Sequence, residues 1–304
     1  MTPNLIVILG PTASGKTKLA ARLAYDTNSE IISADSRQVY RGMDIGTGKD
    51  LVDYIIGNRE IPHHLIDIVD PEDDFNVFEY QSRFYKCFEE ILSRNILPIL
   101  VGGTGLYLSS VLEGYKMVKV PENPALRESL NKKSQEFLRQ RLLEINPSVH
   151  NTTDLLERER TIRAIEIAEY SKKREKDQYC PSFRIQPLIL GVRWDRKILR
   201  QRIAGRLRDR LQAGMIDEVM ELHRSGISWD RLHFFGLEYR YVSLFLQNKI
   251  TYQEMTQNLI IHINQFAKKQ ETWFRRMERH GVNIFWIDGD DYRAMKEFVV
   301  GILK

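Results

Sequence analysis

An eight-residue segment near the amino terminus has the composition and spacing of a phosphate-binding loop. Residues 5–9 before it form an apolar run, and residues 18–24 after it follow a helical pattern. In such a loop the backbone N–H groups, the start of the helix and the lysine ammonium converge on phosphate oxygens, and the threonine hydroxyl can ligate Mg²⁺. A glycine-rich turn without a ligand is the alternative. The loop consists of Gly10, Pro11, Thr12, Ala13, Ser14, Gly15, Lys16 and Thr17.

A carboxylate follows the next apolar run, residues 30–33. Asp35 lies within residues 33–40, where it could ligate Mg²⁺ or act as a general base, or could cap a following helix. Residues 42–49 form a second glycine-rich segment, flexible enough to close over a ligand. The sequence therefore predicts an acid near the phosphate loop.

A third segment of interest follows the apolar run at residues 96–101. It contains Thr104 among three glycines and lacks the acidic residue expected in an ordinary nucleotide hydrolase. The glycines allow a close backbone approach to a ligand, and the Thr104 hydroxyl can bond phosphate or a base; a tight strand-to-helix turn is the alternative.

The elements that must position these residues alternate along the chain. Helical stretches separate most of the apolar runs, which predicts an α/β fold with a doubly wound parallel sheet of the P-loop type. Ligands bind beyond the carboxyl ends of such strands, so the three segments are expected to converge on one cleft. The predicted strands are residues 5–9, 30–33, 96–101, 187–192 and 282–287.

Residues 116–183 have no strand signal and several amphipathic helical patterns. They are expected to form a helical insertion into a catalytic core made of residues 1–115 and 184–304, the latter ending in helices. No sustained heptad pattern occurs, which favours a monomer.

Positive charge is concentrated rather than spread. The net charge of the 304 residues is +4, whereas residues 193–210 alone hold eight basic and two acidic residues. Such a segment suits a polyanion or a diphosphate, although a solvated helix face is the alternative. Cys87 and Cys180 are too few for a disulfide framework or zinc site, and no apolar run reaches the length of a membrane span or a cleavable leader. A cytoplasmic protein is expected.

Five blocks together resemble the tRNA dimethylallyltransferase family. They occur in the family's order and comprise residues 10–17, 33–40, 42–47, 101–107 and 267–275. The resemblance implies that the loop holds the diphosphate of dimethylallyl diphosphate and that the prenyl group goes to N6 of adenine 37 of tRNA. An exocyclic adenine amine is a poor nucleophile, so such an enzyme must orient it and stabilise the leaving group. The base must also be flipped out of the anticodon loop.

The resemblance also assigns roles to single residues. Asp35 is the implied general base, Thr17 the Mg²⁺-binding hydroxyl and Thr104 a contact to the target nucleotide. Lys16 and either Arg202 or, preferably, Arg206 are expected to neutralise the diphosphate during catalysis. Implied tRNA contacts, besides Asp35 and Thr104, are Ser36, Arg37, Gln38, Arg160, Arg163, Phe234, Phe235, Gly236, Lys268, Lys269, Gln270, Thr272, Trp273 and Arg275.

Two segments depart from the family pattern. Residues 233–239 replace a Gly-Tyr-Lys/Arg block with a sequence in which Gly236 is followed by Leu237 and Glu238, and residues 263–264 replace a Thr-Arg pair with Ile-Asn. Both lie where the family meets tRNA. Phe234 and Phe235 could stack on bases or belong to the core.

Other functions fit parts of the sequence. A P-loop kinase would share the loop but would consume ATP without needing the basic C-terminal helix. A relative that prenylates free adenine nucleotides would share Asp35 and dispense with the RNA-binding blocks. A non-catalytic nucleic-acid-binding module would leave Lys16 and Asp35 without a task. The adjacent His63 and His64 lack the i, i+4 spacing of a helical zinc site.

Overall fold

The computed structural model describes residues 2–115, 117–147, 155–173 and 184–303. Cys180 lies outside the described residues. The chain divides into two compact units, the first made of Met1–Gly114 and Phe183–Lys304 and the second of Tyr115–Ser182.

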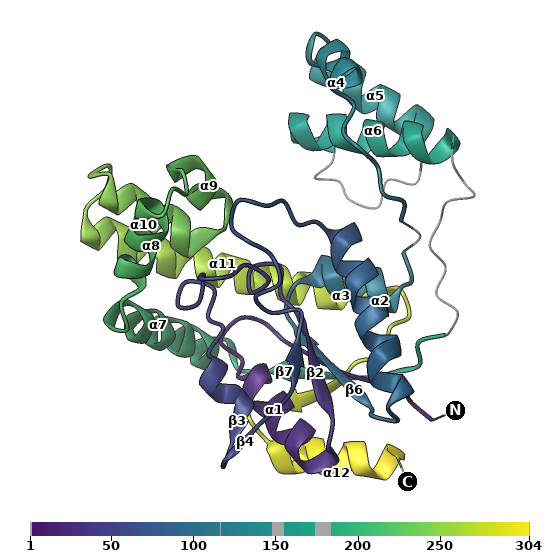
Figure 1. The fold of residues 1–304 in the computed structure, drawn as a ribbon, viewed down its shortest axis with the longest axis vertical. Helices are drawn as coiled ribbons and strands as arrows, with labels where there is room; N and C mark the ends of the chain where they lie inside the picture. The colour runs from purple at the N-terminus through teal and green to yellow at the C-terminus, as the bar shows by residue number, and fades with distance from the viewer. Residues whose placement is uncertain (1, 116, 148–154, 174–183, 304) are drawn as a thin grey trace. The chain divides into compact units, whose positions relative to one another are not determined.

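A parallel sheet forms the centre of the first unit (Figure 1). Its strands are β1 (Leu5–Leu9), β2 (Glu30–Ala34), β5 (His63–His64), β6 (Pro98–Gly102), β7 (Pro187–Arg193) and β8 (Phe285–Asp288). The spatial order is β5-β2-β6-β1-β7-β8, and every pairing is parallel. The glycine-rich phosphate loop follows β1, which lies between β6 and β7. A separate antiparallel hairpin pairs β3 (Ile55–Ile56) with β4 (Arg59–Glu60).

Helices of the first unit cover the sheet and extend beyond it. They are α1 (Lys16–Thr27), α2 (Val77–Ser93), α3 (Gly105–Leu112), α7 (Arg196–Gln212), α8 (Met215–Arg224), α9 (Trp229–Phe234), α10 (Leu237–Leu246), α11 (Tyr252–Arg279) and α12 (Tyr292–Leu303), with a 3₁₀ turn at Leu51–Tyr54. Local signals start several of them. Asn76 caps α2, and Thr251 with Glu254 forms a capping box at the start of α11.

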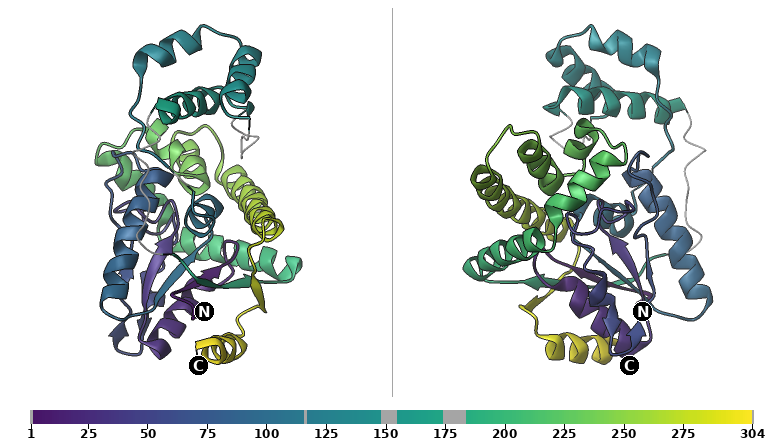
Figure 2. Two further views of the ribbon diagram at one scale, coloured as in Figure 1. Left: turned by 90° about the vertical axis from the view of Figure 1, so that its right-hand side faces the viewer. Right: turned by 60° about the vertical axis from the view of Figure 1, so that its left-hand side comes forward.

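The two faces of the sheet pack against different helices because successive side chains of a strand point in opposite directions. Ile6 and Ile8 of β1 belong to a core shared with α1 and α12. Leu5, Val7 and Leu9 belong to a second core shared with α2, α3 and the end of α11. Figure 2 shows this arrangement in two further views. The sheet is therefore sandwiched between helical layers, and its strand ends are fixed on both sides.

A third core joins the helices that follow β7. Leu199, Ile203 and Leu207 of α7 pack with apolar residues of α8, α9, α10 and the first half of α11. Val39 and Tyr40, which follow β2, enter the same core. This core therefore ties the turn after β2 to the helical layer.

The second unit contains α4 (Pro124–Asn131), α5 (Gln135–Ile145) and α6 (Arg158–Lys173). Its small core is formed by residues from all three helices. They are Leu130, Leu138, Leu142, Ile162 and Ile165.

The predicted fold class is confirmed, and each of the five predicted strands is present with ends shifted by a few residues. The prediction missed β5, the strand His63–His64 at the edge of the sheet. Two polar residues give no apolar run, and their pairing with Ile31 and Ile32 depends on the tertiary fold.

Candidate active site

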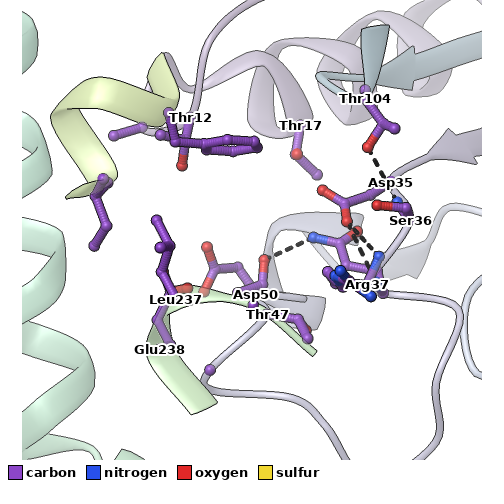
Figure 3. Close-up of a pocket in the computed structure, with 18 of the residues that line it drawn as sticks. Thr12, Thr17, Asp35, Ser36, Arg37, Thr47, Asp50, Thr104, Leu237 and Glu238 are labelled. Atoms are coloured by element: carbon purple, nitrogen blue, oxygen red, sulfur yellow. Dashed lines mark hydrogen bonds between the residues drawn. The ribbon is translucent and has the colours of Figure 1, made fainter. Parts of the chain in front are cut away.

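A cavity of about 510 Å³ opens where the phosphate loop, the end of β2 and the end of β6 meet (Figure 3). This is the edge of the sheet at which α/β proteins bind ligands. The convergence of the three segments predicted from the sequence is thus present. Further lining comes from residues 46–53, from α7, from residues 233–240 and from α11.

The phosphate loop is shaped by backbone conformation and held from outside. Gly15 has φ +84°, a left-handed conformation that favours glycine, and immediately precedes α1. Trp194 Nε1 donates to the Ser14 carbonyl at 2.9 Å, and Arg202 Nε donates to the Ala13 carbonyl at 2.9 Å. The first turn of α1 has neither an acidic residue nor a side-chain cap, so its N–H groups can receive an anion.

The eight loop residues differ in their access to the cavity. Thr12, Ala13, Gly15, Lys16 and Thr17 line it. Three others are buried, which suits support of the loop. They are Gly10, Pro11 and Ser14.

Lys16 is the cation at the centre of the loop. Its Nζ donates to the Pro11 carbonyl at 3.3 Å. The pKa of Lys16 is lowered to about 8, chiefly by burial; nearby Arg206 and Arg210 also lower it, and Asp35 raises it. Placing so many cations together is unfavourable without an anion, so the charge distribution favours a ligand with several negative oxygens.

Asp35 stands at the end of β2 and organises the turn that follows. Its Oδ1 accepts hydrogen bonds from the backbone N–H groups of Arg37 at 2.9 Å and Gln38 at 3.4 Å. Among the described residues, Oδ2 receives no hydrogen bond. The residue caps a turn rather than a helix, and its second oxygen stays available to accept a proton in the cavity.

Thr104 connects the ends of β6 and β2. Its Oγ1 accepts a hydrogen bond from Ser36 N at 3.1 Å, and its own N–H donates to the Ala34 carbonyl at 3.2 Å. Among the described residues, this hydroxyl donates to no other group, so its proton can be donated to a ligand. Ser36, Arg37 and Gln38 line the same cavity, and Gln38 Nε2 donates to the Gly48 carbonyl at 2.9 Å.

Arg202 and Arg206 approach the cavity from successive turns of α7. The Arg202 guanidinium lies 4.3 Å from the centre of the Trp194 ring and above the loop. Arg206 forms an ion pair with Asp50 and donates to the Gly48 carbonyl at 3.2 Å. Both line the cavity, so their positions do not decide which of them binds the diphosphate. The preference for Arg206 stays a prediction.

The second glycine-rich segment is anchored rather than loose. Glu218 of α8 accepts hydrogen bonds from the backbone N–H groups of Asp44, Ile45 and Gly46 at 2.6–2.9 Å. Tyr239 donates to the same carboxylate at 2.7 Å. The sequence predicts that this segment can close over a ligand. These hydrogen bonds restrict its movement, and its glycine content alone did not indicate them.

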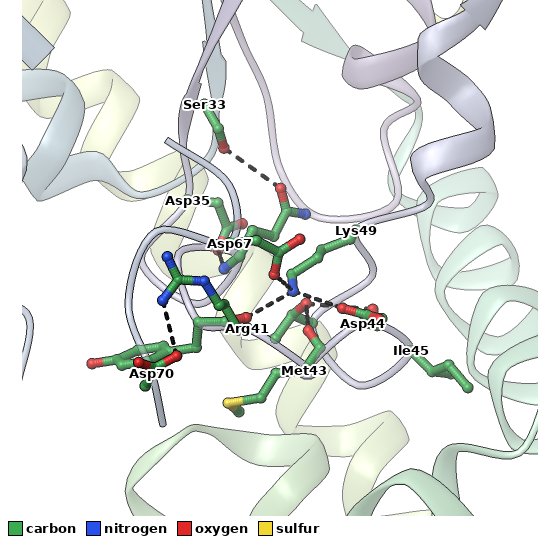
Figure 4. Close-up of polar contacts among 12 residues, drawn as sticks. Ser33, Asp35, Arg41, Met43, Asp44, Ile45, Lys49, Asp67 and Asp70 are labelled. Atoms are coloured by element: carbon green, nitrogen blue, oxygen red, sulfur yellow. Dashed lines mark hydrogen bonds and ion pairs between the residues drawn. The ribbon is translucent and has the colours of Figure 1, made fainter. Parts of the chain in front are cut away.

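Lys49 fixes the other end of this segment (Figure 4). Its side chain is fully buried, and Nζ donates to the Tyr40 carbonyl at 2.7 Å and to Asp44 Oδ1 at 2.6 Å, with a further ion pair to Asp67. We expect Lys49→Met to lower the free energy of unfolding by about 3 kcal/mol, because the carboxylates lose their buried partner. Chemical denaturation measures this, with Lys296→Met as the control.

The control replaces a lysine whose side chain is 47 % exposed and which pairs with Asp26 at 2.7 Å. A pair of this exposure contributes at most about 1 kcal/mol. Equal losses of stability for the Lys49 and Lys296 variants would contradict the anchoring role.

Residues 233–236 form a wall of the cavity. Phe234 is 51 % exposed, and the guanidinium groups of Arg37 and Arg231 lie 5.1 and 5.0 Å from its ring centre. Phe235 is 1 % exposed and packs edge-on against Tyr40. Of the two rings, only that of Phe234 can be reached by a base. Gly236 follows at the cavity wall.

The predicted tRNA contacts on α11 are of two kinds. Gln270 is buried and bridges two loops, accepting from Thr12 N at 2.8 Å and donating to the Gly103 carbonyl at 2.8 Å. Trp273 packs against α3 and donates to Ser109 Oγ at 2.9 Å. Four other residues are exposed on the helix surface: Lys268, Lys269, Thr272 and Arg275.

Arg160 and Arg163 belong to α6 of the second unit. Arg160 is exposed and pairs with Glu157 at 3.0 Å. Arg163 forms an ion pair with buried Glu166 and donates to the Val120 carbonyl at 2.8 Å. Arg160 is thus the more available of the two for an outside ligand, while the predicted tRNA contacts of both stay predictions.

The structure brings further charged residues to the cavity that the sequence did not assign to the site, among them Asp50, Arg210 and Glu238. Asp50 pairs with Arg206, and Arg210 pairs with Glu238. Residues four apart in a helix lie on the same face. The spacing of Arg202, Arg206 and Arg210 could therefore have predicted that Arg210 joins the other two at the cavity. Nothing in the sequence indicated the pairing of Arg210 with Glu238.

No cluster of three or more His, Cys, Asp and Glu side chains suitable for a metal ion occurs among the described residues. Among the described helices, none combines the length and apolar character needed to span a bilayer.

The sequence matches two family models, "IPP transferase" over residues 38–277 and "Isopentenyl transferase" over residues 3–64. It is 69 % identical to tRNA dimethylallyltransferase 1 of Syntrophus aciditrophicus over the full length of both chains. It is 57 % identical to tRNA dimethylallyltransferase 1 of Geotalea uraniireducens, covering 95 % of this chain and 94 % of that one.

Solved structures agree with these matches. The tRNA isopentenylpyrophosphate transferase of Bacillus halodurans superimposes with a TM-score of 0.70 at 32 % identity, covering 98 % of this chain and 96 % of that one. A eukaryotic dimethylallyltransferase acting on tRNA shares the fold, with a TM-score of 0.76 at 21 % identity over 94 % of this chain and 74 % of that one. The chain belongs to the tRNA dimethylallyltransferase family of prenyltransferase enzymes.

Proposed function

We propose that this protein transfers a dimethylallyl group from dimethylallyl diphosphate to N6 of adenine 37 in tRNA. The observation that carries the proposal is that Lys16 of the phosphate loop and the Asp35 carboxylate face one cavity of about 510 Å³. That volume lies within the range of about 300–1,000 Å³ typical of small-molecule sites. The cavity thus has an anion-binding end and a proton-accepting group within one enclosure.

The donor's diphosphate is proposed to bind across the phosphate loop and the first N–H groups of α1. Lys16 and Arg206 would pair with its oxygens, and Arg202 would hold the loop through its hydrogen bond to the Ala13 carbonyl. Negative charge on the diphosphate grows as the bond to the allylic carbon breaks. Cations already fixed around it stabilise that charge most in the transition state.

The residues present suit Mg²⁺ bound together with the diphosphate. Mg²⁺ prefers oxygen ligands and is usually held by one or two protein groups plus substrate phosphates. Thr17, whose hydroxyl lies in the cavity wall, is the proposed protein ligand. When bound, the ion would neutralise charge on the leaving diphosphate.

Asp35 is proposed to accept the proton of the nucleophile. As the N6 to carbon bond forms and the carbon to oxygen bond breaks, an N6 proton becomes acidic and passes to Oδ2, while diphosphate leaves with the bonding electrons. Thr104 would donate its hydroxyl proton to the flipped nucleotide. The base can reach the site because unstacking in an anticodon loop is inexpensive.

The tRNA is proposed to contact the cavity rim, the exposed side of α11 and the helical second unit. Supporting groups are the exposed ring of Phe234 and the exposed cations Lys268, Lys269 and Arg275. Arg160 would add phosphate contacts from α6. We further propose that the protein works as a monomer in the cytoplasm, the compartment that suits a tRNA substrate.

Phe234→Ala is expected to raise KM for tRNA by about 5- to 100-fold, because stacking on one aromatic ring contributes about 1–3 kcal/mol per base. Transfer assays at varied tRNA concentration measure this. Tyr25→Ala is the matched control, since Tyr25 of α1 is 43 % exposed and lies outside the cavity lining. Equal KM values for the two variants would show that Phe234 does not contact the tRNA.

The proposed function is tested with purified protein, labelled dimethylallyl diphosphate and Mg²⁺, supplied with either unmodified tRNA or AMP. We expect label to enter tRNA and not AMP. Transfer to AMP alone would indicate a nucleotide prenyltransferase. Consumption of ATP without prenyl transfer would indicate a kinase.

A further inference from the structure

The two segments that depart from the family pattern meet at the cavity. Residue 237 is leucine where the pattern has tyrosine, and residue 263 is isoleucine where it has threonine. Leu237 starts α10, Ile263 lies on α11, and both line the cavity. Each change replaces a side chain that carries a hydroxyl group with an aliphatic one. This part of the cavity is therefore more apolar than the family pattern indicates.

Phe266 extends this surface from the next turn of α11, and the three residues form the apolar side of the cavity. Phe266 is 44 % exposed and Leu237 is partly buried, so a ligand can reach both. Ile263 is 7 % exposed and belongs to the core against which Leu237 packs. Other apolar and aromatic lining residues are at most 3 % exposed: Tyr54, Val101, Phe235 and Tyr239. An apolar ligand in the cavity can therefore contact Leu237 and Phe266 far more than these four.

The apolar side of the cavity lies next to the phosphate loop. Ala13 of the loop packs against the same core as Leu237. Gln270, one turn of α11 beyond Phe266, accepts a hydrogen bond from Thr12 N at 2.8 Å. Figure 3 shows the Leu237 side chain reaching from α10 toward the side of the cavity where Thr12 lies. A chain attached to an anion on the loop therefore has apolar side chains within reach.

The donor of the proposed function has two chemically different parts. Its diphosphate requires cations and N–H donors, which the loop supplies together with Lys16 and Arg206. Its dimethylallyl chain is a branched hydrocarbon without a hydrogen-bonding group, so it gains free energy by leaving water for an apolar surface. A site that combines a polar and an apolar side suits such a molecule.

We propose that Leu237 and Phe266, supported by Ile263, form the subsite for the dimethylallyl chain of the donor. The inference rests on the proposed function, since that function supplies the donor. A phosphate loop by itself accepts many diphosphate esters. Contact with the apolar side of the cavity selects an ester that carries a short hydrocarbon chain.

Isothermal titration of the full-length protein with Mg²⁺ and without tRNA tests the subsite. The two ligands are dimethylallyl diphosphate and methyl diphosphate, an ester of the same charge that lacks the chain. The wild type should bind the first about 10-fold or more tightly than the second. Leu237→Ala is expected to weaken the Kd for dimethylallyl diphosphate by about 10-fold and to leave the Kd for methyl diphosphate within about twofold of the wild type.

Conservative and matched variants separate contact with the chain from a general defect. Leu237→Met keeps an apolar side chain of similar volume, so its Kd for dimethylallyl diphosphate should stay within about threefold of the wild type. Leu246→Ala is the matched control, since Leu246 lies on the same helix, is partly buried against the same core and is outside the cavity lining. It should bind both ligands as the wild type does.

Phe266→Ala gives a test that does not depend on core packing, because the Phe266 side chain is largely exposed. It should weaken binding of dimethylallyl diphosphate by about 5-fold or more, without a change for methyl diphosphate. Tyr252→Ala should change neither Kd, since Tyr252 is a 50 % exposed aromatic residue of α11 outside the cavity lining.

Two results would overturn the subsite. One is a wild-type Kd for dimethylallyl diphosphate in both Leu237→Ala and Phe266→Ala. The other is equal weakening for the two ligands, which would assign the defect to the diphosphate site or to the fold. If the wild type transfers the prenyl group to tRNA in either case, the proposed function stands. A wild type that neither prefers dimethylallyl diphosphate over methyl diphosphate nor prenylates tRNA would overturn both.

Discussion

Replacing Asp35 with asparagine is expected to lower kcat for prenyl transfer by about 10²- to 10⁴-fold, the usual contribution of a general base. Asparagine keeps the side-chain oxygen that accepts hydrogen bonds from the N–H groups of Arg37 and Gln38. The turn after β2 should therefore survive, and affinity for tRNA and diphosphate should stay within about twofold of the wild type. Single-turnover transfer assays measure the chemical step directly.

Asp35→Ala is the informative companion to this variant. Alanine removes both the proton acceptor and the cap of the turn, so it should lose stability as well as activity, by about 1 kcal/mol. If Asp35→Asn turned over at a rate near that of the wild type, Asp35 would not be the base. If Asp35→Asn lost affinity for tRNA together with activity, the Asp35 carboxylate would instead act in tRNA binding.

Replacing Lys16 with alanine is expected to lower kcat by about 10²- to 10³-fold, the effect of removing one group that stabilises developing charge. Diphosphate affinity should fall as well, because the ammonium pairs with the anion before and after bond cleavage. Transfer assays with saturating tRNA separate the two effects. Unchanged diphosphate affinity in Lys16→Ala would contradict the placement of the diphosphate on this loop.

The titration of Lys16 gives a second test of its role. Because its pKa is lowered to about 8, the side chain is an ammonium below that pH and a neutral amine above it. Only the ammonium attracts diphosphate, so affinity should fall as pH rises through about 8. Diphosphate itself also titrates in this range. The pH dependence of the Kd of Lys16→Ala measures that contribution, so it can be subtracted from the pH dependence of the wild type. Lys16→Arg should abolish the inflection, since arginine stays charged.

The sequence predicted those parts of the fold that depend on local pattern. The apolar runs located five strands, and the loop from Gly10 to Thr17 marked the end of the cavity at which the diphosphate is proposed to bind. Asp35 and Thr104 could be placed at the same edge of the sheet, since parallel strands end together.

The other features of the site depend on tertiary contacts. Gln270 lies on a basic helix, and only the packing of α11 against two loops makes it a buried bridge. The neighbouring Phe234 and Phe235 are alike in sequence, yet the helical core buries one and leaves the other exposed. Likewise, the pairing of Arg210 with Glu238 joins positions 28 residues apart on different helices. No periodicity encodes such a contact.

The phosphate loop is proposed to hold a prenyl donor whose group is transferred to one adenine of tRNA. Mass spectrometry of nuclease fragments, after unmodified tRNA is incubated with the protein, dimethylallyl diphosphate and Mg²⁺, tests it most directly. We expect a mass increase of one dimethylallyl group confined to the fragment containing adenine 37, and N6-dimethylallyladenosine on full digestion. Unmodified tRNA, or a prenyl group on another nucleotide, would contradict the account.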